Sequence, residues 1–292
     1  MSSPLEEKRS RDTANSGDAY CVRLPFFLYS FMPTNNFYKN SPVGCLLVHG
    51  FTGSPNELLE LGGFLARKNV TVSIPTLPGH GTYSGDLFNY TWKDWFACVK
   101  AAFHELEQNC KEMFVCGLSM GGTLALHLAA HKPVHGVISL AGAVEFPIWQ
   151  KVGAKYLKNT IKFYKKRDRE DVLDRAVKEQ LDSYDRYPLY AVDQLFRMMD
   201  HVREDLSEIS QPILIMHSRK DHTVDFSNSE VIYNSVSSAD KRKIDLKDSY
   251  HVITVDVEKE RVQNEVFRFL DDHSELLKAR SSKEAGTKPH VN

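Results

Sequence analysis

The chain has 292 residues and a mass of 33.3 kDa, which suits one large α/β domain with an insertion, or two small domains. Lys and Arg number 37 against 38 Asp and Glu, and this balance argues against a protein that binds nucleic acid through an excess of positive charge. With 42% apolar and 11% aromatic residues, the composition excludes a disordered chain.

The sequence shows no membrane or targeting signal. No run reaches the roughly 18 apolar residues of a membrane span. The first 20 residues carry four acidic side chains, unlike a signal or transit peptide. The five cysteines are irregularly spaced and form no CxxC pair, a usage typical of a reducing compartment. We therefore expect a cytoplasmic protein.

Short apolar runs alternate with longer amphipathic runs from residue 45 to residue 140. The apolar runs are predicted to be strands at 45–48, 70–74, 113–116 and 136–140, and the amphipathic runs helices at 55–68, 91–108 and 120–131. Strands this apolar are covered on both faces. The pattern therefore predicts an α/β fold with a mostly parallel central sheet and helices on both faces.

The alternation breaks between residues 145 and 210, where only helical patterns are found. It resumes with a strand at 212–216, a helix at 227–236, a strand at 242–246 and a helix at 256–273. The interruption predicts a small helical cap over one edge of the sheet. The predicted organisation is a partly disordered extension over 1–40, core over 41–144, cap over 145–210, core over 211–278 and a flexible tail over 279–292.

The strongest chemical signal is Gly-Leu-Ser-Met-Gly-Gly at 117–122, between a predicted strand and a predicted helix. A serine in so tight a turn needs glycine neighbours, because a Cβ atom there would clash. The hydroxyl of Ser119 would then lie beside a helix N-terminus, whose free N–H groups favour a developing oxyanion. The alternative is an ordinary glycine-rich turn, but the context favours a nucleophile.

A serine nucleophile needs a base, and His251 is the best of the twelve histidines. It follows a predicted strand, lies in a loop and comes last in the order nucleophile, acid, base. His222 is the main competitor, but it adjoins the predicted acid and the two side chains would diverge. Other histidines are expected to shape loops, face away or pack, namely His49, His80, His127 and His131.

The acid is predicted to be Asp221, in the loop after the strand at 212–216. It would accept the ring N–H of His251, select its tautomer and stabilise the imidazolium. Asp225 and Asp248 are alternatives; Asp225 is expected to cap the next helix, and Asp248 to lie in a turn.

Two backbone N–H groups are expected to stabilise the oxyanion. The loop after the first core strand supplies one donor in such folds, and here it places the N–H of Phe51 beside that of Met120. The ring of Phe51 would then line the acyl pocket.

Four segments match a known family in order and spacing: 49–55, 77–81, 117–122 and 250–256. They resemble the small bacterial carboxylesterases and monoacylglycerol lipases of the α/β-hydrolase superfamily over roughly residues 42–273. The resemblance implies a serine esterase with Ser119, Asp221 and His251 as its triad. It also implies that Phe51 and Met120 supply the oxyanion N–H groups. Ser218 departs from the family pattern, which often has glycine there.

The predicted cap has two features that bear on substrates and partners. Residues 151–170 hold eight basic and two acidic side chains, a net charge of 8 − 2 = +6, interleaved with apolar ones. This pattern is typical of a basic amphipathic helix, either a solvated face or a surface that contacts anionic lipids or ligands. An apolar stripe either packs on the core or partly lines an acyl tunnel: Leu189, Val192, Leu195, Phe196, Met199, Val202 and Leu206.

The sequence thus predicts a serine hydrolase that cleaves small-molecule carboxylic esters through an acyl-enzyme, with short- to medium-chain esters or monoacylglycerols as substrates. No metal or organic cofactor is needed. Alternatives are a lipase specific for long-chain monoacylglycerols, then a thioesterase or peptidase. A non-catalytic binding protein of this fold would have lost a triad member, and none is lost here.

Overall fold

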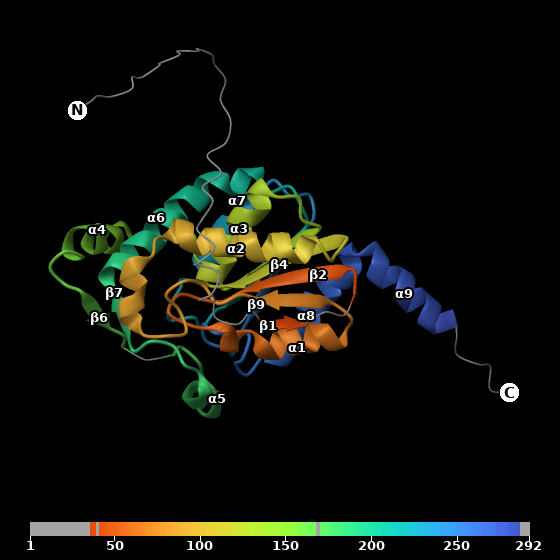
Figure 1. The fold of residues 1–292 in the computed structure, drawn as a ribbon, viewed down its shortest axis with the longest axis horizontal. Helices are drawn as coiled ribbons and strands as arrows, with labels where there is room; N and C mark the ends of the chain where they lie inside the picture. The colour runs from red at the N-terminus through yellow and green to blue at the C-terminus, as the bar shows by residue number, and fades with distance from the viewer. Residues whose placement is uncertain (1–35, 39–40, 168–169, 287–292) are drawn as a thin grey trace, which may run out of the picture. The chain divides into compact units, whose positions relative to one another are not determined.

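The computed structural model describes residues 36–38, 41–167 and 170–286. Its centre is a seven-stranded sheet with the order β1-β3-β2-β4-β5-β8-β9 (Figure 1). The strands are β1 (Asn36–Tyr38), β2 (Val43–Val48), β3 (Thr71–Ile74), β4 (Glu112–Leu118), β5 (Gly136–Leu140), β8 (Ile213–Ser218) and β9 (Lys241–Leu246). β1 runs antiparallel to β3, and the other six strands are parallel. The predicted mostly parallel sheet is confirmed.

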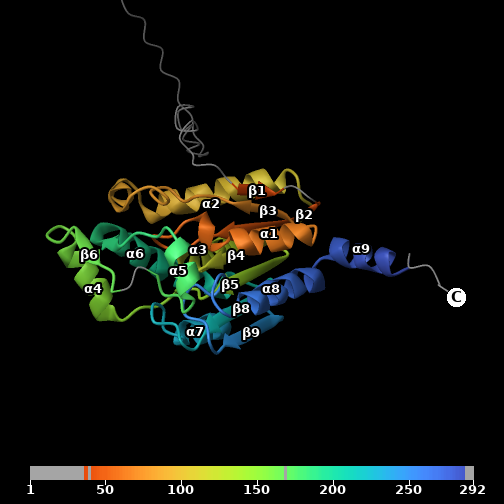
Figure 2. The same cartoon turned by 90° about the horizontal axis from the view of Figure 1, so that it is seen from below.

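Alternate residues of each strand belong to different apolar layers, and helices cover both faces of the sheet (Figure 1), one of which is seen from the front in Figure 2. Cys45 and Leu47 of β2 share a layer with α1 (Leu59–Arg67) and α8 (Lys259–His273). Leu46 and Val48 share the other layer with α2 (Trp92–Glu107), α3 (Met120–His131) and α7 (Ser227–Ser235). Two 3-10 turns, η2 (Pro55–Glu57) and η3 (Ser84–Asn89), lie in the connections.

The segment between β5 and β8 contains α4 (Ile148–Leu157), β6 (Phe163–Lys165), α5 (Arg175–Gln180), β7 (Arg186–Pro188), α6 (Leu189–Asp205) and η4 (Leu206–Glu208). β6 and β7 pair antiparallel as a separate two-stranded sheet. The expectation that 145–210 contains only helices was therefore wrong. Strands of three residues are too short to show alternation in sequence. Among the described residues of the basic stretch 151–170, the helix extends only as far as Leu157.

The two ends of the chain also differ from the expectation. Residues 36–38 of the predicted extension form β1, and the rest of it lies outside the described residues. Helix α9 (Glu275–Gly286) continues past residue 279, where a flexible tail was expected. None of the helices in the described ranges is both long and apolar enough to cross a membrane.

Candidate active site

Ser119 lies at the turn between β4 and α3 with φ 54° and ψ −118°, in the left-handed region that non-glycine residues rarely adopt. Its glycine neighbours allow this turn. A Cβ atom on Gly117 would stand 2.0 Å from the carbonyl oxygen of Gly121, and one on Gly121 would stand 2.0 Å from the carbonyl oxygen of Val48. The predicted strand, tight turn and helix are all present.

Helix α3 begins at Met120, whose N–H therefore has no intrahelical acceptor. Phe51 lies in the loop after β2 and lines the same pocket as Met120 and Ser119. The ring of Phe51 stacks on that of Tyr187, with centroids 6.0 Å apart, and lies 5.8 Å from that of Trp95. The structure therefore brings Phe51 and Met120 to the same pocket as the serine.

His251 and Asp221 are joined by a hydrogen bond of 2.7 Å from Nδ1 of the imidazole to Oδ2 of the carboxylate. The other oxygen of Asp221 accepts the N–H groups of Thr223 and Val224, each at 2.8 Å. The carboxylate is fully buried, and its Oδ2 also lies 3.1 Å from Nε2 of His217. These contacts hold the carboxylate in one orientation toward His251.

The electrostatics of this pair favour the charged carboxylate. Burial alone would raise the pKa of Asp221, but His251 and His217 hold it well below its usual range. Burial alone would lower the pKa of His251, but the Asp221 carboxylate raises it above its usual value. Ser119 and His251 line one pocket without a direct hydrogen bond among the described residues. Such contacts often tighten only when substrate binds.

The alternative acids serve other purposes. Asp225 accepts hydrogen bonds from the N–H and hydroxyl of Ser227 at 2.9 and 2.5 Å, and so bonds the first N–H of α7, although the N-cap position itself is occupied by Phe226. Asp248 pairs at the surface with Nζ of Lys220, at 3.0 Å. Neither carboxylate is bonded to His251.

Asp171 is a residue of the site that the sequence did not indicate. Its backbone carbonyl accepts the N–H groups of His251 and Val252, at 3.0 and 3.2 Å. Its carboxylate accepts the N–H of His222 at 2.9 Å and the hydroxyl of Thr223 at 3.2 Å. Nδ1 of His222 lies 2.9 Å from the other oxygen. His222, the rejected base, is thus bonded to the residue that ties together the loops of His251 and Asp221.

Other contacts fix the loop that carries His251. The buried carboxylate of Asp256 accepts the N–H of Tyr250 at 2.7 Å and that of Leu173 at 3.0 Å. The hydroxyl of Ser218 donates to the carbonyl of Ser249. Ser218 is the departure from the family pattern, and here it links the strand before Asp221 to the loop before His251.

His49 and His80 support the loops, as predicted. Nε2 of His49 accepts the N–H of Leu77 at 3.1 Å, and Nδ1 of His80 lies 3.2 Å from the carbonyl of Pro78. Burial lowers the pKa of His49 to about 4 and that of His80 well below its usual value. Both rings are therefore neutral at pH 7 and unsuited to exchange protons with a substrate.

The pocket encloses about 820 Å³ and is bounded by Ser119 and His251 on the core side. Its apolar wall comes largely from the segment 145–210: Phe146, Ala154, Leu157, Leu189, Val192, Leu195, Phe196 and Met199. The predicted apolar stripe therefore divides: its first five residues line the pocket, whereas Val202 and Leu206 are buried in the core.

Charged side chains gather at another part of the lining: Glu57, Lys166, Arg167, Glu170 and Asp171. Glu57 is buried and accepts the N–H of Gly50 at 2.8 Å. Burial, and then the nearby carboxylate of Glu170, raise the pKa of Glu57 to about 8. Glu57 is therefore largely protonated at pH 7 and can donate as well as accept a hydrogen bond.

This combination of a strained serine turn, a histidine–aspartate pair and a parallel sheet agrees with comparisons to known proteins. The family model described as serine aminopeptidase, S33, matches residues 43–258. The chain belongs to this family of α/β-hydrolases.

Related α/β-hydrolases include esterases and lipases. A thermostable monoacylglycerol lipase of Bacillus sp. (strain H-257) is 37% identical over 82% of this chain and 94% of its own. A carboxylesterase of Bacillus subtilis (strain 168) is 28% identical over 80% of this chain and 94% of its own. A structure from work on the metagenome-derived lipolytic enzymes LipS and LipT has a TM-score of 0.78 and 31% identity, covering 82% of this chain and 97% of that one. Within its family, the chain is thus similar to proteins named as esterases and lipases.

Proposed function

We propose that this α/β-hydrolase cleaves carboxylic esters through an acyl-enzyme, with Ser119 as nucleophile, His251 as base and Asp221 as the orienting acid. The observation that carries the proposal is the 2.7 Å bond between His251 and the buried Asp221, at the pocket that also holds Ser119. His251 Nε2 takes the serine proton as the hydroxyl attacks the ester carbonyl, and returns it to the departing alcohol. Water, deprotonated by the same imidazole, then releases the acid.

The N–H groups of Phe51 and Met120 are proposed to hold the tetrahedral oxyanion. Met120 opens α3, so the partial positive charge of the helix N-terminus adds to its hydrogen bond. Removing one such donor typically costs about 10²–10³ in kcat. Fixed donors of this kind cost no reorganisation at the moment of reaction.

The substrate is proposed to be an ester that joins one apolar acyl chain to a small polar alcohol, as in a monoacylglycerol. The long apolar wall from α4 and α6 fits the acyl chain, and the charged lining near Glu57 and Lys166 can hydrogen-bond hydroxyl groups. The similarity to the Bacillus monoacylglycerol lipase supports this assignment. A short-chain carboxylesterase is the second candidate, supported by the Bacillus subtilis relative.

We also propose that α4 gives the cap segment a transient contact with anionic membrane surfaces. Ile148 and Trp149 are 73% and 69% exposed, and Tyr156 and Lys155 lie on the same helix. An exposed apolar and aromatic group flanked by basic residues suits an interfacial position. The unpaired positive charge is smaller than the sequence count implies, because Lys151 and Lys158 form ion pairs with Asp200 and Asp193 of α6.

Co-sedimentation with vesicles tests this contact. Anionic vesicles should retain more protein than neutral ones, and Trp149→Ala should reduce that binding. Equal binding to both kinds of vesicle, or binding to neither, would contradict it.

Hydrolysis of p-nitrophenyl esters of increasing acyl length, with 1-oleoylglycerol alongside, tests the main proposal. Ser119→Ala should abolish turnover and labelling by a serine-directed fluorophosphonate, whereas Ser237→Ala, at an exposed position, should change neither. Strong turnover of 1-oleoylglycerol supports a monoacylglycerol lipase, and a preference for short esters supports a carboxylesterase. Activity that survives in Ser119→Ala would rule out the assigned nucleophile.

A further inference from the structure

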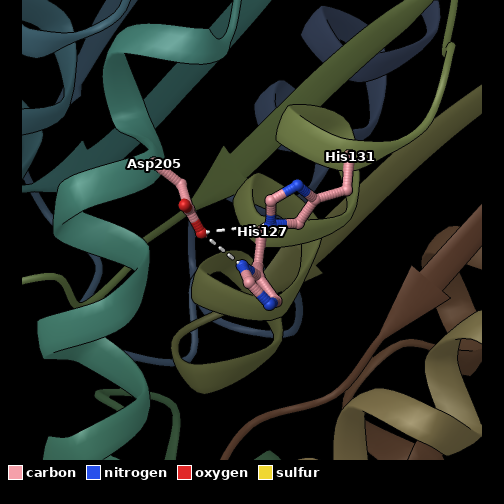
Figure 3. Close-up of side chains that lie close together, drawn as sticks. All are labelled: His127, His131 and Asp205. Carbon is pink, nitrogen blue, oxygen red and sulfur yellow. Dashed lines mark hydrogen bonds and ion pairs between the residues drawn. The ribbon is translucent and has the colours of Figure 1, made fainter. Parts of the chain in front are cut away.

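A second group of ionisable side chains lies outside the pocket, where helix α3 meets the end of α6 (Figure 3). His127 and His131 are one turn apart on α3, and Asp205 is the last residue of α6. Both rings point toward one carboxylate oxygen of Asp205. The distances to that oxygen are 2.6 Å from Nδ1 of His127 and 3.4 Å from Nε2 of His131.

Two imidazoles and a carboxylate are the ligands preferred by Zn²⁺ and related transition-metal ions. The i, i+4 spacing places both histidines on one face of the helix. The three ligand atoms lie within 4.8 Å of one another. Ligands at zinc bond lengths stand about 3.3 Å apart in a tetrahedron, so small side-chain movements would admit an ion. We infer that His127, His131 and Asp205 form a site for a divalent transition-metal ion.

The surroundings suit such a site. The ring of His127 packs against those of Phe96 and Trp92, at 4.2 and 5.8 Å, which holds it in place. The side chain of His131 is 49% exposed, so solvent can reach the ion and supply further ligands.

The ion would be structural in function, because it lies away from the proposed nucleophile. His127 and His131 follow Ser119 by 127 − 119 = 8 and 131 − 119 = 12 residues, or about 12 and 18 Å along α3. The site would instead tie α3 of the core to α6, whose residues Leu195 and Met199 line the pocket. A bound ion therefore holds one wall of the pocket against the core.

The test is a calorimetric titration. The full chain is first treated with a chelator to remove bound metal, and the heat of Zn²⁺ binding then gives the affinity and the stoichiometry. The wild type should bind one equivalent, and His131→Ala and Asp205→Asn should each weaken this binding by about 10–100-fold, as loss of a ligand or its support does. His104→Ala is the matched control, because His104 is an exposed histidine beside an acid, Glu107, on α2. It should leave the affinity unchanged. His127→Ala is avoided, since the ring is packed in the core.

Two further measurements make the outcome decisive. Zn²⁺ should raise Tm in the wild type and in His104→Ala but not in His131→Ala or Asp205→Asn. Co²⁺ should give the visible absorption of a low-coordinate site in the wild type and in His104→Ala, but not in His131→Ala or Asp205→Asn. No stoichiometric binding, or equal affinity in the wild type and His131→Ala, would overturn the inference and leave the cluster as a hydrogen-bonded ion pair.

Discussion

Replacing Asp171 with asparagine tests how far the segment 145–210 supports the loops that carry His251 and Asp221. The substitution leaves the three triad residues themselves unchanged. The substitution keeps the shape of the side chain and the backbone carbonyl that accepts the N–H of His251. It removes the negative charge and one of the two acceptor oxygens that bond to His222 and Thr223. The amide nitrogen that replaces that oxygen can only donate, so it would face either the backbone N–H of His222 or the ring Nδ1 of His222, which must then switch to its accepting tautomer.

The expected cost follows from these contacts. The side chain of Asp171 is only 15% exposed, and a donor left without its acceptor costs about 1–3 kcal/mol. In a chain of this size Tm should fall by about 2–4 °C for each kcal/mol. Looser loops also hold His251 and Asp221 less firmly. We expect kcat/KM of Asp171→Asn to fall about tenfold. This corresponds to about 1.4 kcal/mol, which lies within the range of about 1–3 kcal/mol for the lost hydrogen bond.

The pH profile distinguishes an electrostatic effect from a purely structural one. The charge of Asp171 helps to raise the pKa of His251. His251 must be neutral to act as a base, so kcat/KM rises as pH increases through that pKa. Asp171→Asn should therefore move the acidic limb of the profile to lower pH.

The assay is the pH dependence of kcat/KM on a soluble p-nitrophenyl ester, with Tm measured alongside. Asp185→Asn is the control, because Asp185 is an exposed carboxylate of the same segment that pairs with its neighbour Arg186. It should change neither quantity. An Asp171→Asn protein with the Tm and the pH profile of the wild type would refute the reasoning. A lower Tm with an unmoved acidic limb would refute its electrostatic part.

Three further predictions concern single substitutions. Gly121→Ala should destabilise the fold by more than about 3 kcal/mol in urea unfolding, because its Cβ would stand 2.0 Å from a backbone carbonyl oxygen, whereas Gly63→Ala, in a helix with only ordinary contacts, should stabilise it slightly. Asp221→Asn should lower kcat by roughly 10⁴-fold and move the acidic limb to lower pH, since the carboxylate raises the pKa of His251; an unchanged kcat would exclude Asp221 as the acid. Glu57→Gln should flatten the pH dependence of Tm, because a buried acid whose pKa is raised to about 8 stabilises the fold most below pH 4.5 and loses that contribution as pH rises through 8.

The core of the fold was predictable because its signals are local. Five-residue strand β5 and helix α3 have the bounds that the sequence predicts, since each apolar run is continuous and ends at a turn. The serine turn was predictable because its motif is short and lies between a strand and a helix. The contact that requires Gly117 is local, with Gly121, whereas the one that requires Gly121 is with Val48 of the neighbouring strand β2. His251 and Asp221 could be paired because each follows a parallel strand, and such strands end at one edge of the sheet.

The support around this core could not be predicted, because its contacts join residues far apart in the chain. Asp171 belongs to no motif, and its role depends on His222 and His251, which lie 51 and 80 residues later by 222 − 171 and 251 − 171. Asp205 has the same character, since only the packing of α6 against α3 brings it to His127. In both cases an aspartate from the segment 145–210 forms hydrogen bonds with histidines of the core. Substitutions in that segment should therefore change catalysis and metal binding without touching any residue of the serine turn.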